Sequence, residues 1–158
     1  MNESKRLANQ LKKALEGGAW HGPSWRDALE DVSCEQALEQ PVGNAHSIAE
    51  IVLHASTWHE GVRQRLQGET PEVPDSQDWP VVTLTDESTW EAAKERLFTS
   101  GRALYEVVDR FPMERLHEPR RNAEGTWYEL VIGELQHITY HAGQVSLLRK
   151  AGVQATSH

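Results

Sequence analysis

Four long segments of this chain carry apolar residues at every third or fourth position, which is the period of an amphipathic α-helix. No segment shows a convincing strand pattern of alternating apolar and polar residues. The period predicts helices over residues 3–16, 47–67, 87–110 and 126–150. Residues that stop helices follow these segments: Gly17-Gly18, Gly68, Phe111-Pro112, and Gly152 as the cap of the last. The sequence therefore predicts an all-α fold, a four-helix bundle.

Two of the connections between these helices are long. Residues 19–43 contain Ser24 and Ser33, each directly before a short acidic run, so we expect short helices in this connection. Residues 68–88 are rich in Pro, Asp, Ser and Thr without a sustained period, which predicts a long exposed crossover. A crossover of this length can span the bundle and let the third long helix run parallel to the second. We expect a single domain over residues 1–158.

The composition argues against several classes of function. The formal net charge of -8 disfavours nucleic acid as a partner, and the adjacent Arg120 and Arg121 are typical of a solvated loop. No apolar run approaches the roughly 20 residues of a membrane span, and the first ten residues lack the apolar stretch of a signal peptide. The single cysteine, Cys34, excludes an internal disulfide and a multi-thiolate zinc site, and Glu35 beside it disfavours a reactive thiolate. We therefore expect a cytoplasmic protein in which histidines and carboxylates are the candidate metal ligands.

The last predicted helix carries three polar residues on its inward apolar stripe: Glu134, His137 and His141. His137 and His141 are one turn apart, so their Cβ atoms are roughly 5–6 Å apart and one metal ion can bind both imidazoles. His54 lies on the apolar stripe of the second predicted helix. Burial of three unpartnered imidazoles would cost on the order of a few kcal/mol, which a divalent metal ion would offset. We predict a three-histidine site, open on one side, for zinc, nickel, manganese or iron; buried hydrogen-bonded histidines are the alternative.

Two familiar metal motifs fit less well. A zinc protease places Glu directly after the first His as general base, and Ile138 occupies that position here. A ferritin-like di-metal bundle needs two Glu-x-x-His motifs on core helices. Glu134 and His137 form one such motif, but the second, Glu114 and His117, lies in a proline-flanked, loop-like segment. Both alternatives are therefore disfavoured.

Other polar residues could support chemistry at this site. Glu134 could be a further ligand, orient an imidazole or accept a proton from bound water. Gln144 could hydrogen-bond a histidine and Tyr140 could donate a proton, although ordinary packing roles are commoner for both. His21 lies in the first long connection and could form a wall of the pocket, so Glu134 and His21 are the catalytic candidates. The other histidines have weaker cases: His46 at a helix start, His59 off the main stripe, His117, and His158 at the end of the chain.

Four segments of the chain resemble the DinB-like superfamily. They are AWHGPSW, AHSIAEIVLHASTWHEGVRQRLQGE, DWP and TWYELVIGELQHITYHAGQVSLLRK, of which HITYHAGQVSLLRK is the most specific. This superfamily includes YfiT-type proteins regarded as metal-dependent hydrolases and the thiol transferases that use bacillithiol or mycothiol. The resemblance implies a four-helix bundle with an unusual crossover, often assembled as a homodimer. It also implies a metal site, commonly nickel or zinc, at His54, His137 and His141.

The resemblance leaves the reaction open. Members of the superfamily differ in chemistry, so a hydrolase and a transferase of a low-molecular-weight thiol are both compatible with these residues. In an enzyme of this kind the metal would activate water or a thiolate by lowering its pKa, and a small-molecule substrate would occupy the open side. The alternative is a non-catalytic bundle that the metal stabilises and that acts as a binding or dimerisation module.

Overall fold

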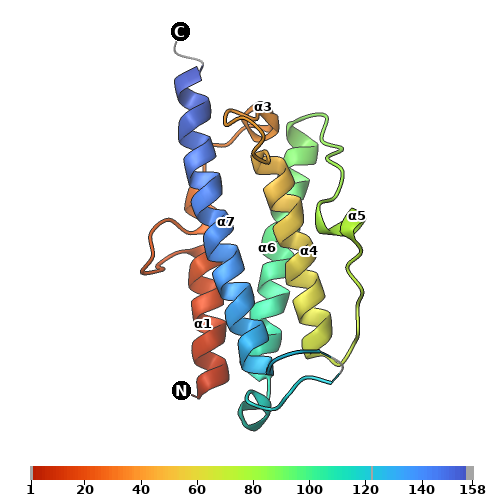
Figure 1. Cartoon of the computed structure of the whole chain (residues 1–158). Helices are drawn as coiled ribbons and strands as arrows, with labels where there is room; N and C mark the ends of the chain where they lie inside the picture. Colours follow the sequence, from red (N-terminus) through yellow and green to blue (C-terminus); the bar gives the residue numbers. More distant parts are fainter. Residues whose placement is uncertain (1, 122, 156–158) are drawn as a thin grey trace.

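The computed structural model describes residues 2–121 and 123–155, and four long helices form its body (Figure 1). The helices in chain order are α1 (Glu3–Glu16), α2 (Trp25–Leu29), α3 (Cys34–Leu38), α4 (Ile48–Leu66), α5 (Asp75–Asp78), α6 (Glu87–Arg110), the 3-10 helix η1 (Met113–Arg115) and α7 (Trp127–Ala155). Helix α4 contacts α6 and α7, and α1 contacts the same two helices. Helices α4 and α6 run in the same direction, as do α1 and α7 (Figure 1). The predicted all-α four-helix bundle with a long crossover is confirmed.

Side-chain caps fix where the helices begin. Ser47 Oγ accepts a hydrogen bond from Glu50 N, and the Glu50 carboxylate accepts one from Ser47 N at 2.7 Å. The same reciprocal arrangement starts three other helices, at Ser24, Ser33 and Asp86. Local sequence chemistry thus explains why the predicted starts of α4 and α6 agree with the structure to within one residue.

The predicted end of the last helix is wrong, because α7 continues through Gly152 to Ala155. Gly152 is buried, and a Cβ atom at this position would lie 2.9 Å from Glu39 Oε2. The glycine therefore allows the connection after α3 to approach α7 closely, instead of capping the helix.

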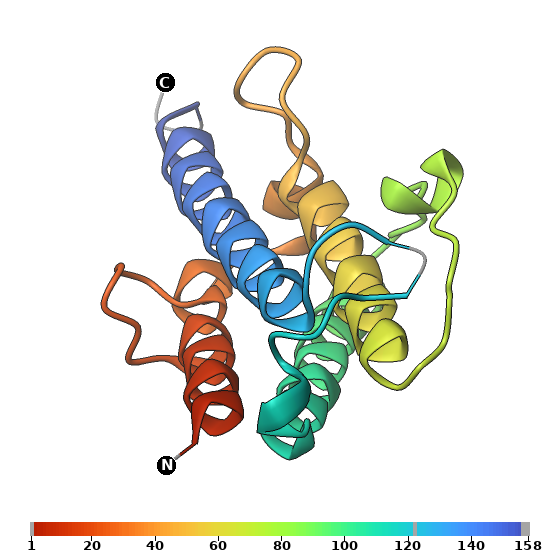
Figure 2. The same ribbon diagram turned by 60° about the horizontal axis from the view of Figure 1, so that its bottom comes forward.

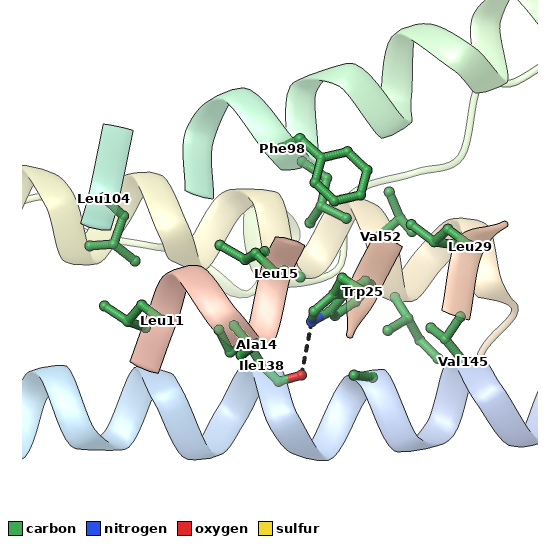
Figure 3. Close-up of a cluster of buried hydrophobic side chains, with 14 of the residues drawn as sticks. Leu11, Ala14, Leu15, Trp25, Leu29, Val52, Phe98, Leu104, Ile138 and Val145 are labelled. Carbon is green, nitrogen blue, oxygen red and sulfur yellow. Dashed lines mark hydrogen bonds between the residues drawn. The ribbon is translucent and has the colours of Figure 1, made fainter. Parts of the chain in front are cut away.

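Two buried tryptophans attach the first long connection to the bundle. Trp25 on α2 is enclosed by the core, and its Nε1 donates a 2.9 Å hydrogen bond to Ile138 O on α7 (Figure 3). Trp90 Nε1 on α6 donates a 2.7 Å hydrogen bond to Val32 O. Each indole buries a large apolar surface while its N–H finds an acceptor. The bond to Ile138 O fixes the backbone of α7 between His137 and His141.

The crossover between α4 and α6 runs back along the outer side of α4 and carries α5 (Figures 1 and 2). It is not exposed throughout as predicted, since Asp78 and Trp79 are partly buried against α4. The crossover therefore contributes to the surroundings of His54. Among the described residues no helix is both long and apolar enough to cross a membrane.

Candidate metal centre

Helices α4 and α7 bring three histidine side chains together. His54 Nε2 lies 2.9 Å from His137 Nε2, which lies 3.0 Å from His141 Nε2. The three ligand atoms are all within 4.8 Å of one another. His54 and His141 are each 5% exposed, and His137 is half-buried at the cavity described below. The inward positions predicted from helical spacing are therefore those the structure shows.

Hydrogen-bond partners fix which ring nitrogen of His54 and His141 carries a proton. His54 Nδ1 lies 2.6 Å from Asp78 O, a carbonyl oxygen that can only accept, so Nδ1 donates. His141 Nδ1 donates to Gln144 Oε1 at 2.6 Å, while Gln144 Nε2 donates to Tyr140 Oη at 3.1 Å. In the neutral rings Nε2 then carries the lone pair. Both lone pairs are directed toward His137 Nε2.

The electrostatic environment keeps these imidazoles neutral. Burial lowers the pKa of His54, with a smaller contribution from neighbouring His137. Burial and then His137 lower the pKa of His141 to about 4. Because a metal binds the neutral form, His54 and His141 need not release a proton before they bind an ion.

The three histidines fit a divalent metal ion. Two nitrogens that are each about 2.1 Å from one ion, at right angles, are about 3.0 Å apart, which matches the two Nε2 separations. Imidazole nitrogen is a good ligand for zinc, nickel and iron. Three protein ligands leave further coordination positions for water or substrate. The cluster could therefore hold a metal ion with an open side.

The crossover holds His54 in place through Asp78 and Trp79. Trp58 Nε1 donates a 2.7 Å hydrogen bond to Asp78 Oδ1, so α4 binds the residue that accepts from His54. The Trp79 ring stacks on His54 with a centroid separation of 3.9 Å and on His46 at 3.6 Å. Sequence reasoning missed Asp78 as a site residue, although DWP was among the segments that carried the resemblance. Only the DWP motif points to Asp78 in the sequence, because this residue does not belong to a helical repeat of apolar positions.

A second buried layer, formed by Glu134 and His59, lies behind His137. Glu134 is 4% exposed, and its Oε2 lies 3.3 Å from His137 Nδ1, within ion-pair distance but not aligned as a hydrogen bond. Glu134 Oε1 lies 3.8 Å from His59 Nε2, and neither atom has a hydrogen-bond partner. Burial raises the pKa of Glu134 and lowers that of His59 to about 4. Of the predicted roles for Glu134, this geometry fits the orientation of His137 best.

His59 lies off the main stripe, as expected, but it is fully buried, with an exposed fraction of 0%. Its Nδ1 pairs with Ser100 Oγ at 3.2 Å, and Ser100 Oγ donates to Leu97 O. Helix α4 packs against α6 as well as α7, so it is buried over two faces. His59 belongs to the face toward α6.

A cavity of about 570 Å³ adjoins the three histidines. Its lining residues come from α4, the crossover, the loop before α7 and α7 itself: His54, Trp58, Val62, Asp78, Arg120, Glu129, Leu130, Gly133, Glu134, His137, Tyr140 and His141. The volume lies within the range of small-molecule sites. His21 is exposed and does not line this cavity, so the expected wall from its loop is not found.

The remaining candidates lie apart from the histidine cluster. His117 is exposed and pairs with Glu3, 3.0 Å away, and Glu114 is also exposed, so this motif does not form a second core half-site. Cys34 is buried, and burial followed by Glu87 raises the pKa of its thiol, which disfavours a nucleophile. His158 lies outside the described residues.

Comparison with known families identifies the superfamily of the chain. The profile described as the DinB superfamily matches residues 20–144, a range that includes the three histidines, Asp78 and Glu134. No curated protein and no solved structure matches the chain significantly.

Proposed function

The chain belongs to the DinB superfamily, and on that premise we propose that it is a metal-dependent enzyme that binds one divalent ion through His54, His137 and His141. Nickel or zinc suits three imidazoles best, and manganese or iron is the further choice. The reaction is hydrolysis of a small molecule or transfer of a low-molecular-weight thiol to it. The observation that supports this proposal is the convergence of the three Nε2 atoms beside a cavity of about 570 Å³.

The residues around the cluster have separable roles in this proposal. A bound divalent ion supplies the charge that lowers the pKa of a water or thiol in its open position. Asp78 and Gln144 keep the Nε2 lone pairs of His54 and His141 directed toward a common point. Trp79 covers one face of His54, and Glu134 steadies His137 from the buried side.

Metal binding and turnover are measured separately. The metal-free chain is titrated calorimetrically with Zn²⁺, Ni²⁺, Mn²⁺ and Fe²⁺, and elemental analysis gives the ion retained after purification. Turnover is then assayed with model esters, and with several low-molecular-weight thiols paired with a chlorinated aromatic electrophile. We expect tight binding of one ion per chain, with affinity lowered more than about 100-fold in His137→Ala. Turnover should be lost with it.

The exposed His117→Ala variant is the matched control and should behave as the wild type. Equal metal affinity in wild type and His137→Ala would contradict the proposal. Tight binding with no turnover on any substrate pair would favour the non-catalytic alternative, a bundle that the metal stabilises. That alternative has one observation in its favour, since the histidine cluster joins α4, α7 and, through His54, the crossover.

We also propose that the protein acts in the cytoplasm as a homodimer. The single cysteine supports a reducing compartment, and the superfamily resemblance supports the dimer. Light scattering coupled to size exclusion measures the mass in solution, and a monomer at micromolar concentration would contradict the dimer.

A further inference from the structure

Arg120 lies in the wall of the metal-site cavity and is held there by its loop. Its backbone N donates to Gly125 O at 3.0 Å, and Pro119 pairs with Thr126 in an isolated antiparallel bridge. Figure 2 shows this loop crossing the end of the bundle beside α4 and the start of α7. Arg120 also lines a neighbouring hollow of about 870 Å³, together with Arg65 from the last turns of α4. The two hollows therefore share this arginine.

Arg65 and Arg120 are partly buried without a carboxylate partner. Arg65 Nη1 and Arg120 Nε are both inaccessible to solvent and lack an acceptor. Within residues 2–121 and 123–155, neither side chain is within 4.0 Å of a carboxylate oxygen. Arg63, two residues from Arg65 on α4, is paired with Glu60. Each guanidinium also donates to a backbone carbonyl, Arg65 Nη2 to Pro71 O at 3.4 Å and Arg120 Nη2 to Glu124 O. In the described part of the chain, Arg65 and Arg120 are the arginines with a solvent-inaccessible nitrogen that lacks an acceptor.

The two guanidinium groups lie close enough to oppose each other. Burial and then the charge of Arg120 lower the pKa of Arg65. Glu129 and the buried Glu134 act on these guanidinium groups only from beyond 4.0 Å. Hydrogen bonds from Thr126, and then the charge of Arg120, lower the pKa of Glu129, while the charge of Glu134 partly opposes the lowering of the Arg65 pKa. The Arg65 guanidinium lies over the Trp58 ring, 5.6 Å from its centroid, and Trp58 lines the metal-site cavity. A small anion beside Arg120 in this cavity would relieve the repulsion between the two guanidinium groups.

We propose that Arg120, supported by Arg65, binds a carboxylate of the small-molecule ligand. Because Arg120 Nε is inaccessible to solvent, the carboxylate is bound through the two Nη atoms, whose N–H groups can form two parallel hydrogen bonds with it. The carboxylate is then at one end of the ligand, and the group that reaches the three histidines is at the other. The ligand class assigned to the site is therefore acidic small molecules. The contact of the ligand with a metal ion at the three histidines rests on the proposed function, whereas the carboxylate site is argued from the two arginines alone.

The test uses matched thiols that differ only in their far end. Binding of 3-mercaptopropionate, 6-mercaptohexanoate and the corresponding mercaptoalcohols to the zinc-loaded full chain is measured by calorimetry. We expect at least one acid to bind about 10-fold more tightly than its alcohol, since a charge-assisted hydrogen bond contributes this much or more. The preference should fall to about 1-fold in Arg120→Gln and be reduced in Arg65→Gln.

Arg121→Gln is the matched control, because Arg121 is the exposed neighbour in the same loop, and its preference should equal that of the wild type. Circular dichroism verifies that each variant is folded. No acid preference at either chain length, or an unchanged preference in Arg120→Gln, would overturn the proposal. A 6-mercaptohexylphosphonate that binds more tightly than the acid would assign the site to phosphate esters and overturn the carboxylate assignment.

A second titration distinguishes failure of the proposed metal centre from failure of the proposed carboxylate site. If the chain binds no metal, hexanoate and hexanol are titrated into the metal-free protein while the side-chain nuclear magnetic resonance signals of the arginines are followed. Shifts caused by hexanoate, absent with hexanol and absent in Arg120→Gln, would support the carboxylate site without the metal. Identical spectra with both compounds would overturn it.

Discussion

At the scale of single residues, His59 couples the stability of the metal-free protein to pH. Its folded pKa of about 4 lies below the ordinary value of 6.5, because burial disfavours the charged ring. The unfolded chain therefore binds more protons between pH 6.5 and pH 4, and stability falls as pH falls through that window. His59 alone should cost about 2 kcal/mol of unfolding free energy between pH 7.5 and pH 5.

Urea unfolding of wild type and His59→Gln in chelator, at both pH values, measures this contribution. The variant should lose about 2 kcal/mol less than the wild type on acidification, whatever its stability at pH 7.5. His21→Gln replaces an exposed histidine outside the core and is the control. Equal pH dependence in wild type and His59→Gln would show that His59 is not the group responsible.

Glu134 offers a second test at this scale. Its carboxylate lies beside the Nδ1 of His137, so Glu134→Gln should weaken metal binding by about 10-fold while preserving the shape of the side chain. Glu129→Gln is the control, since Glu129 lines the same cavity but is engaged by Thr126. Calorimetric titration with Zn²⁺ measures both variants. A larger loss of affinity in Glu129→Gln than in Glu134→Gln would reverse the assigned roles.

Residue spacing could predict only part of this site. His54, His137 and His141 lie on single apolar stripes, so the helical period was enough to orient them inward. Asp78 comes from a crossover without a period, and its bond to His54 depends on where that segment returns along α4. The burial of His59 was not predicted, because a single apolar stripe implies that a helix packs on one side only. Helix α4 packs on two sides, against α6 and α7.

At the scale of elements, the helices were predictable because period and capping chemistry agree. The exception is the end of α7, where Gly152 serves a close contact with Glu39 that no local pattern encodes. The crossover was anticipated from its length, and the parallel course of α4 and α6 follows from it (Figure 1). The packing of the crossover on the histidine cluster could not be predicted, because it depends on tertiary contacts that no local sequence pattern encodes.

Two glycines in long helices should respond oppositely to substitution. A Cβ at Gly101 on α6 would lie 2.6 Å from Leu15 Cδ1 and 3.2 Å from His59 Cε1, where the core leaves no room. Overpacking costs about 1–3 kcal/mol, and the helix propensity of alanine offsets about 0.5–1 kcal/mol of it, so Gly101→Ala should lower the free energy of unfolding by up to about 2 kcal/mol. Gly143→Ala on α7 meets nothing within 4 Å and should raise it by about 0.5–1 kcal/mol. Denaturant unfolding of both variants checks the pair, and a stabilising Gly101→Ala would refute the tight contact between α1, α4 and α6.

At the scale of the whole molecule, the histidine cluster links parts of the chain that are distant in sequence. His54 lies on α4, His137 and His141 lie on α7, and Asp78 and Trp79 bring the crossover onto His54. A metal ion at the cluster would bind only the folded arrangement. At a free concentration about 100 times the Kd it would stabilise the protein by about 2.7 kcal/mol, or raise Tm by about 5–10 °C.

Metal binding should also slow amide hydrogen exchange in residues 76–84, because fixing the His54 ring fixes the surface on which Trp79 stacks. Trp79→Ala removes that stacking, so the metal should still raise Tm while the slowing in this segment is largely lost. Trp20→Ala removes a fully exposed indole and should retain both effects. Hydrogen exchange followed by mass spectrometry, with and without Zn²⁺, separates the two responses. Unchanged exchange in residues 76–84 of the zinc-loaded wild type would mean that the crossover is positioned independently of the metal site.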